Sequence, residues 1–177
     1  MTAERHAQTP GKQERINSLD REFARLHLNS CALVASTPAE VLYFAIDSST
    51  TSLTGLSPAP GSVGECVLRS AATVEQTFGG ITANLWDDPF EWTLPEYLSS
   101  SSAILTYLAE VEAMRQRAFS SFVDDANLAK QVMLPSGEPA PLSSLLRETL
   151  RRADTLQAHA LVLLKSLSGI RPSGFII

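Results

Sequence analysis

The sequence predicts an all-α protein, a four-helix bundle with long connecting loops. Apolar residues recur at the i, i+3, i+4, i+7 spacing of an amphipathic helix in four long stretches. Segments rich in Gly, Pro, Ser and Thr separate these stretches. Four such helices bury their apolar faces most simply against one another, and a chain of 177 residues is long enough for one core. We therefore expect one domain over residues 13–177.

The first long helix is predicted after a polar N-terminal segment. Residues 1–12 contain turn formers and few apolar side chains, so we expect a disordered tail there. The inward positions that follow have helical spacing: Ile16, Leu19, Phe23, Leu26, His27, Ser30 and Val34.

A short helix is predicted next. Thr37 is the expected capping residue, with Pro38 at the first helical position and Glu40 at the third. The helix should run through residues 41–46. Residues 47–61 have no helical period and predict a loop across one end of the bundle.

The second long helix should open at a capping box formed by Ser62 and Glu65 and stop at Gly79 and Gly80. Residues 86–95 then form an aromatic and acidic segment without helical period, a loop over the bundle or a lid over a pocket. The expected inward stripe of the helix is Val63, Cys66, Ser70, Val74, Thr77 and Ile81.

The third and last long helices are predicted over residues 97–122 and 142–168, the last closed by Gly169. Between them, residues 134–139 have strong turn chemistry, and residues 126–134 predict either a short hairpin strand or an irregular loop. The third helix should turn Ile104, Leu105, Leu108, Val111, Phe119 and Phe122 inward. The last should turn Leu142, Leu146, Ala153, Gln157, Ala160, Leu164 and Leu167 inward.

Composition excludes several classes of partner. The formal net charge of -5 gives no electrostatic reason to bind nucleic acid or an anionic membrane. No apolar run approaches the ~20 residues that span a bilayer, and no signal peptide is recognisable, so we expect a cytoplasmic protein. Cys31 and Cys66 lack a CxxC spacing and predict two buried thiols.

The order of motifs resembles the DinB-like superfamily, the bundle fold of bacillithiol and mycothiol transferases. The matching segments are residues 62–65, which open the second long helix, residues 112–117 in the third, and residues 142–146 and 161–170 at the two ends of the last. The resemblance covers roughly residues 13–172 and rests on apolar and capping positions.

The resemblance implies three metal-binding histidines, one in the second long helix and two spaced i, i+4 in the last. This sequence has Ser70, Ala153 and Gln157 at those positions. None is a good zinc ligand, so we predict no metal and no cofactor. His159 should point toward the polar side of its helix, and His27 is more typical of a hydrogen-bonded core residue than of a ligand.

Inward polar residues are the best remaining functional candidates, because an unpaired polar group in a core costs about 1 to 3 kcal/mol. Ser70, Glu112, Arg115 and Gln157, with His27, form a candidate pocket for a small polar or anionic ligand that Arg115 would grip. The alternative is structural: Glu112 pairs with Arg115, and Gln157 forms a hydrogen bond across the core.

Two functional hypotheses follow. The first is a metal-free, DinB-like binding or interaction module, expected to be a homodimer, whose apolar terminal residues Phe175, Ile176 and Ile177 dock on the bundle or on a second subunit. The second, implied by the resemblance, is a thiol-dependent S-transferase or a metal-dependent hydrolase. It would need a different ligand set, such as His27, Glu112 and Asp154.

Overall fold

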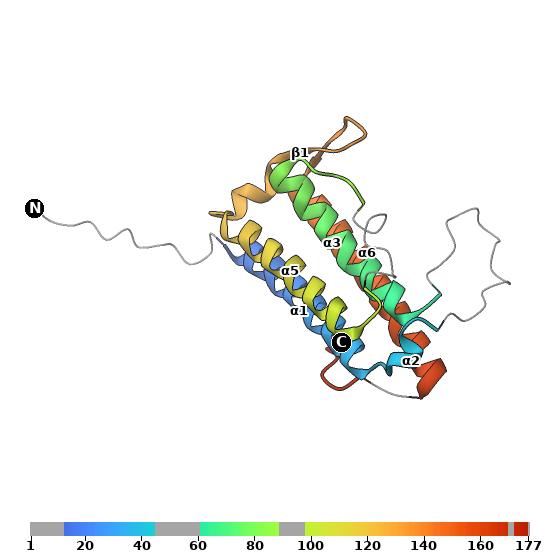
Figure 1. The fold of residues 1–177 in the computed structure, drawn as a ribbon. Helices are drawn as coiled ribbons and strands as arrows, with labels where there is room; N and C mark the ends of the chain where they lie inside the picture. Colours follow the sequence, from blue (N-terminus) through green and yellow to red (C-terminus); the bar gives the residue numbers. More distant parts are fainter. Residues whose placement is uncertain (1–12, 45–60, 89–97, 170–171, 177) are drawn as a thin grey trace, which may run out of the picture.

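The computed structural model describes residues 13–44, 61–88, 98–169 and 172–176 (Figure 1). Within these residues the chain is mostly helical, with one short hairpin. The helices are α1 Glu14–Ser36, α2 Ala39–Leu42, α3 Val63–Ala83, α5 Ser101–Ser120 and α6 Leu142–Ser168. A 3-10 helix, η1 Asp125–Ala129, and two strands, β1 Gln131–Met133 and β2 Pro139–Pro141, connect α5 to α6.

The four long helices pack around one shared core. In Figure 1, α3 lies along α6 and α1 lies along α5, and α3 also contacts α5 while α1 contacts α6. The hairpin lies at one end of these helices and α2 at the other. No helix in the described residues is long and apolar enough to cross a membrane.

The predicted helical stripes are confirmed. The inward positions of α6 are buried from Leu142 to Leu164, and Leu167 is partly buried. Those of α3 are buried from Val63 to Thr77, with Ile81 partly buried. Helical spacing locates these faces because each apolar side chain leaves water when the helices pack, which favours folding by about 25 cal/mol per Å² of apolar surface.

The expected cap at Thr37 is wrong. Pro38 is the N-cap of α2, and its ring provides no capping hydrogen bond. The Thr37 hydroxyl instead donates to the Leu33 carbonyl at 2.6 Å, so this side chain closes α1 rather than opening α2. Helix α2 ends at Leu42, earlier than expected, and residues 45–60 lie outside the described part of the chain.

The expected start of α3 is confirmed, but its expected end is wrong. The Ser62 hydroxyl accepts from the Glu65 amide at 3.2 Å, and the Glu65 carboxylate accepts from the Gly61 amide at 3.0 Å. The helix runs past Gly79 and Gly80 to Ala83 and ends where Asn84 adopts a left-handed conformation, with φ 56°.

The glycines of α3 serve close packing instead of termination. A Cβ atom added to Gly80 would lie 2.4 Å from the Trp86 ring, and one added to Gly79 would lie 3.1 Å from the Leu85 carbonyl oxygen. The chain therefore folds back tightly over the last turns of α3 because these two positions carry no side chain.

Helix α5 is shorter than predicted at both ends. It begins after Ser100, whose hydroxyl accepts from the Ala103 amide at 3.2 Å, and ends at Ser120. Of the two alternatives for the segment after α5, the hairpin strand holds over residues 131–133, which pair antiparallel with residues 139–141. Residues 125–129 form the 3-10 helix.

An aromatic layer fills the core near the hairpin end. Phe23 and Phe78 meet edge to face with ring centroids 5.2 Å apart, and Phe119 lies 5.7 and 5.6 Å from these two rings. Phe122 contacts Phe119 at 5.4 Å. These rings come from α1, α3 and α5 and from the first turn after α5, so the layer joins three of the long helices.

The C-terminal segment docks on α1. The fully buried Asn29 side chain donates to the Ile176 carbonyl at 3.0 Å and accepts from the Ile176 amide at 2.8 Å. Phe175 packs against the core, while the Ile176 side chain is 45% exposed. The partial burial of Phe175 is therefore explained by docking on the chain's own helices, one of the two predicted alternatives. Residues 1–12, most of the aromatic segment 86–95 and Ile177 lie outside the described residues.

Candidate functional site

A small cavity of about 30 Å³ lies among α1, α3, α5 and α6, directly beside the aromatic layer. This volume holds about one or two water molecules. Polar side chains line one part of it, and Phe23, Val74 and Leu108 line another. All five candidate pocket residues are in its wall: His27, Ser70, Glu112, Arg115 and Gln157.

The three positions that the resemblance pairs with metal ligands meet at this level. The Ser70 hydroxyl of α3 donates to the Ala153 carbonyl of α6 at 3.1 Å. Gln157 lies one helical turn further along the same face of α6 and lines the cavity with Ser70. Ser70, Ala153 and Gln157 are all at most 2% exposed. The inward stripes of the two helices place them there.

Gln157 leaves one hydrogen-bonding atom without a partner. Its amide nitrogen Nε2 donates to the Leu26 carbonyl at 2.7 Å and to the Ser30 hydroxyl at 2.8 Å. Its carbonyl oxygen Oε1 is buried and has no hydrogen-bond partner in the described part of the chain. Because an unpaired buried acceptor costs about 1 to 3 kcal/mol, this oxygen is a favourable point for a donor group to bind.

Arg115 is committed to two carboxylates. Its guanidinium donates to Glu112 through Nε at 2.8 Å and Nη2 at 2.6 Å, and its Nη1 donates to the Asp20 carboxylate. It also lies over the Phe119 ring, 5.5 Å from the centroid. The side chain is 4% exposed and its charge is already balanced, so the expected grip on an anion is not supported.

The ionised forms of Glu112 and Arg115 stabilise each other. Burial works against ionisation of Glu112, but hydrogen bonds and attraction from Arg115 outweigh it and hold the pKa of Glu112 below its usual value. Burial also works against the charge of Arg115, and hydrogen bonds to Glu112 and Asp20 outweigh it, raising the pKa of the guanidinium. The structural alternative for this pair, local pairing at i, i+3, is therefore confirmed.

Glu112 and Arg115 also form a wall between two spaces. Both line the small cavity, and both line an outer groove of about 600 Å³ between α1 and α5. Asp20 borders the outer groove only. The Glu112–Arg115 pair therefore separates the cavity from the groove, and Asp20, which pairs with Arg115 on the groove side, is 43% exposed.

The thiols near the cavity are not activated for nucleophilic chemistry. Burial, followed by the charge of Glu112, raises the pKa of Cys31, whose sulfur lies 3.7 Å from His27 Nε2. Burial raises the pKa of Cys66 to about 12. Since the thiolate is the reactive form, neither side chain is suited to attack a substrate near neutral pH. Cys31 is only partly buried, in contrast to the prediction for both cysteines.

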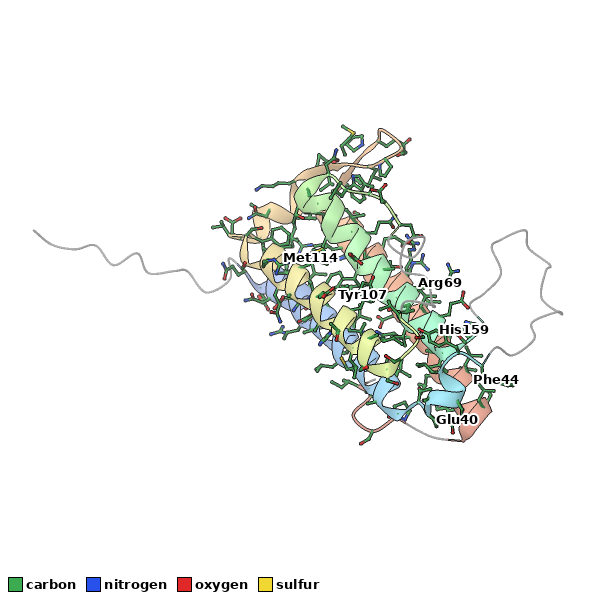
Figure 2. The ribbon with its side chains drawn as sticks, in the orientation of Figure 1. Glu40, Phe44, Arg69, Tyr107, Met114 and His159 are labelled. Carbon is green, nitrogen blue, oxygen red and sulfur yellow. The ribbon has the colours of Figure 1, made fainter. Side chains whose placement is uncertain are left out.

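The alternative metal set is not brought together. No group of three His, Cys, Asp or Glu side chains among the described residues is arranged to hold a metal ion. Asp154 accepts two hydrogen bonds from Arg25 Nη2, at 2.9 and 3.0 Å, on the outer side of α6. His159 lies toward the right-hand edge of the helices in Figure 2, away from α1 and α5, and does not line the cavity.

Sequence reasoning missed several buried polar contacts. Asp20 pairs with Arg115, and Thr77 and Thr149 share a hydrogen bond of 2.8 Å between α3 and α6. Tyr107, labelled in Figure 2, donates to Glu75 at 2.5 Å and joins α5 to α3. Asp20 lies four residues after the inward Ile16, so its position at the edge of the buried face of α1 was the available signal.

No protein-family model, curated protein or solved structure matches this chain.

Proposed function

We propose that this chain is a DinB-like four-helix bundle that acts by binding, and that its cavity receives the hydrogen-bond-donating end of a small polar ligand. The observation that carries the proposal is that Gln157 lines the cavity and that its buried Oε1 has no hydrogen-bond partner among the described residues. The meeting of Ser70, Ala153 and Gln157 at mid-helix supports the resemblance, since the family's metal would lie between the same two helices.

The charges around the cavity favour a protonated amine over an anion. Glu112 and Arg115 line both the cavity and the outer groove, and Asp20 lines the groove, so these three groups together carry a net negative charge across the two spaces. The cavity accepts only an ammonium-sized or hydroxyl-sized group, because its volume is about 30 Å³. The rest of the ligand would lie in the α1–α5 groove beyond the Glu112–Arg115 pair.

Calorimetric titration of the full chain with short primary amines and with acetate tests this proposal. We expect methylammonium and ethanolamine to bind and to raise Tm, and acetate to do neither, because the free buried group is an acceptor. Gln157→Met should abolish amine binding. Gln131→Met is the matched control, since it removes an exposed amide on β1 and should leave binding unchanged. Amine binding that survives Gln157→Met, or no amine binding at all, would overturn the proposal.

The metal-dependent alternative is tested by elemental analysis of the purified protein. Stoichiometric zinc or nickel that survives dialysis, and that His27→Ala removes, would favour an S-transferase or hydrolase over the binding module. The binding proposal expects neither metal at stoichiometric level.

We also propose that the chain forms a homodimer through the α1 surface beside the docked C-terminal segment. Leu28 is 52% exposed and Ile176 is 45% exposed, and Asn29 holds the Ile176 backbone against the same stretch of α1. Sedimentation velocity at micromolar concentration should show a dimer that Leu28→Lys converts to a monomer. Val162→Lys, at an apolar position of α6 that is 59% exposed, is the control and should leave the dimer intact. A monomeric unmodified chain would contradict the proposal.

A further inference from the structure

A second and much larger space lies at the hairpin end of the helices. It is a groove of about 810 Å³ formed by the last turns of α3 and α5, the segment from η1 to β1, and the first residue of α6. The green end of α3, which helps to line it, lies beside the orange hairpin segment in Figure 1. Its volume is within the roughly 300 to 1,000 Å³ of typical small-molecule sites.

The groove has a largely apolar lining. Ile81 and Leu85 line it from α3 and the following turn, Met114 and Phe122 from α5 and the turn after it, and Val132 from β1. Leu85 is 60% exposed, and Met114 is labelled in Figure 2. An apolar ligand body placed here would leave water together with these side chains, which is favourable in proportion to the area buried.

The charged residues of the groove are all basic. Arg117 and Lys130 are in its lining, and no Asp or Glu is. Both side chains are exposed, and neither forms an ion pair with a carboxylate in the described part of the chain. On a chain with a formal net charge of -5, this pair of unbalanced cations complements an anion.

Several backbone carbonyls beside the groove already accept hydrogen bonds within the chain. At the end of α3, the Gly79 and Gly80 carbonyls accept from the amides of Leu85 and Asn84 at 3.2 and 3.1 Å. At the end of α5, the Ala118 carbonyl accepts from both the amide and the hydroxyl of Ser121. Hydrogen bonds within the chain therefore satisfy some of the last carbonyls of both helices.

From these observations we infer that the groove binds an amphipathic organic anion, a carboxylate with an unbranched or compact apolar body. Arg117 and Lys130 hold the carboxylate, and the apolar lining covers the body. The groove favours a small molecule over an acidic peptide because its volume is that of a single ligand pocket, while stable peptide or protein interfaces need a wider surface. This inference does not depend on the proposed role of the interior cavity.

Calorimetric titration of the full chain with decanoate below its micellar concentration tests the inference, with decyltrimethylammonium as the cationic analogue. We expect decanoate to bind at one site per chain and the cation not to bind. Arg117→Gln combined with Lys130→Gln should weaken decanoate binding at least about tenfold, which corresponds to about 1.4 kcal/mol. The matched control, Arg147→Gln combined with Arg152→Gln, removes the same charge from the exposed face of α6 and should change affinity by less than about twofold.

A third variant tests the location of the site. Thr82 is exposed and lines the groove, so Thr82→Trp should fill it without disturbing the core and should abolish decanoate binding. Equal affinities for decanoate and the cation, or decanoate binding that both the double variant and Thr82→Trp leave intact, would overturn the inference. Gln157→Met should leave decanoate binding unchanged, so failure of the amine proposal and failure of this one are distinguishable.

Discussion

Two neighbouring regions of the same core are held together by different interactions, one by aromatic packing and the other by hydrogen bonds and ion pairs. The aromatic layer of Phe23, Phe78, Phe119 and Phe122 holds together by ring contacts between 5.2 and 5.7 Å and has no hydrogen-bonding requirement of its own. The polar layer beside it, around Gln157 and Arg115, depends on donors and acceptors from several helices.

This difference shows where a core can tolerate an imperfect fit. Apolar side chains need only complementary shape, so the aromatic layer is complete with the residues that the helices provide. A polar layer is complete only when every donor and acceptor has a partner, and here Gln157 Oε1 has none among the described residues. We therefore expect the aromatic layer to dominate stability and the polar layer to retain the capacity to bind.

The largest stability loss should come from the aromatic layer. Phe78→Ala removes a fully buried ring that contacts both Phe23 and Phe119 and leaves a cavity, so we expect a loss of about 3 to 5 kcal/mol in the free energy of unfolding. Urea unfolding measures it. Phe44→Ala, at a ring that is 59% exposed, is the control and should cost less than about 1 kcal/mol.

Removing Arg115 from its ion pairs in the polar layer should reduce the free energy of unfolding by less than Phe78→Ala does. Arg115→Met leaves Glu112 and Asp20 without their common partner, but both carboxylates keep some access to water, so we expect a loss of about 2 kcal/mol. The double variant with Glu112→Gln should recover part of this loss in the same urea assay. A single variant as stable as the original chain would show that Arg115 and its partners gain nothing from pairing.

Acidification should affect the polar layer selectively. The pKa of Glu112 is lowered in the folded protein, so its contribution to stability is present above the ordinary glutamate pKa and is lost as the pH falls through the folded value. As the pH is lowered from 6.5 to the lowest pH at which the protein remains folded, the free energy of unfolding should therefore fall less for Glu112→Gln than for the original chain. Glu138→Gln, at an exposed position beside the hairpin turn, should follow the original chain.

The smallest change is expected at Gln157. Gln157→Met gives up two hydrogen bonds of roughly 1 kcal/mol each but also removes a buried acceptor whose isolation costs about 1 to 3 kcal/mol, so the net change should be below about 1 kcal/mol. Chemical unfolding in the absence of added ligand measures it. A loss above about 2 kcal/mol would mean that Oε1 is well satisfied in the folded protein.

The buried faces of the helices could be predicted from the sequence, because they depend on spacing within each helix. The i, i+3 pairing of Glu112 with Arg115 could also be predicted as an alternative, since both residues lie on one local surface. The contact of Arg115 with Asp20 could not, because the two residues are 95 positions apart and meet only when α1 packs against α5.

The ends of the helices were predicted less well for a related reason. A pair of glycines such as Gly79 and Gly80 often ends a helix. Here the absence of their side chains instead lets Trp86 pack closely against Gly80. Asn29 lies between inward positions of α1, and nothing in local spacing shows that it binds Ile176. Such roles are set by tertiary contacts, which overrule local preferences.

The Asn29 contact has a consequence for how the protein is made. Its two hydrogen bonds join positions 147 residues apart, so the Asn29 amide of a nascent chain stays hydrated until residue 176 has left the ribosome. Helix α1 therefore reaches its full set of contacts only after α3, α5 and α6 have been synthesised.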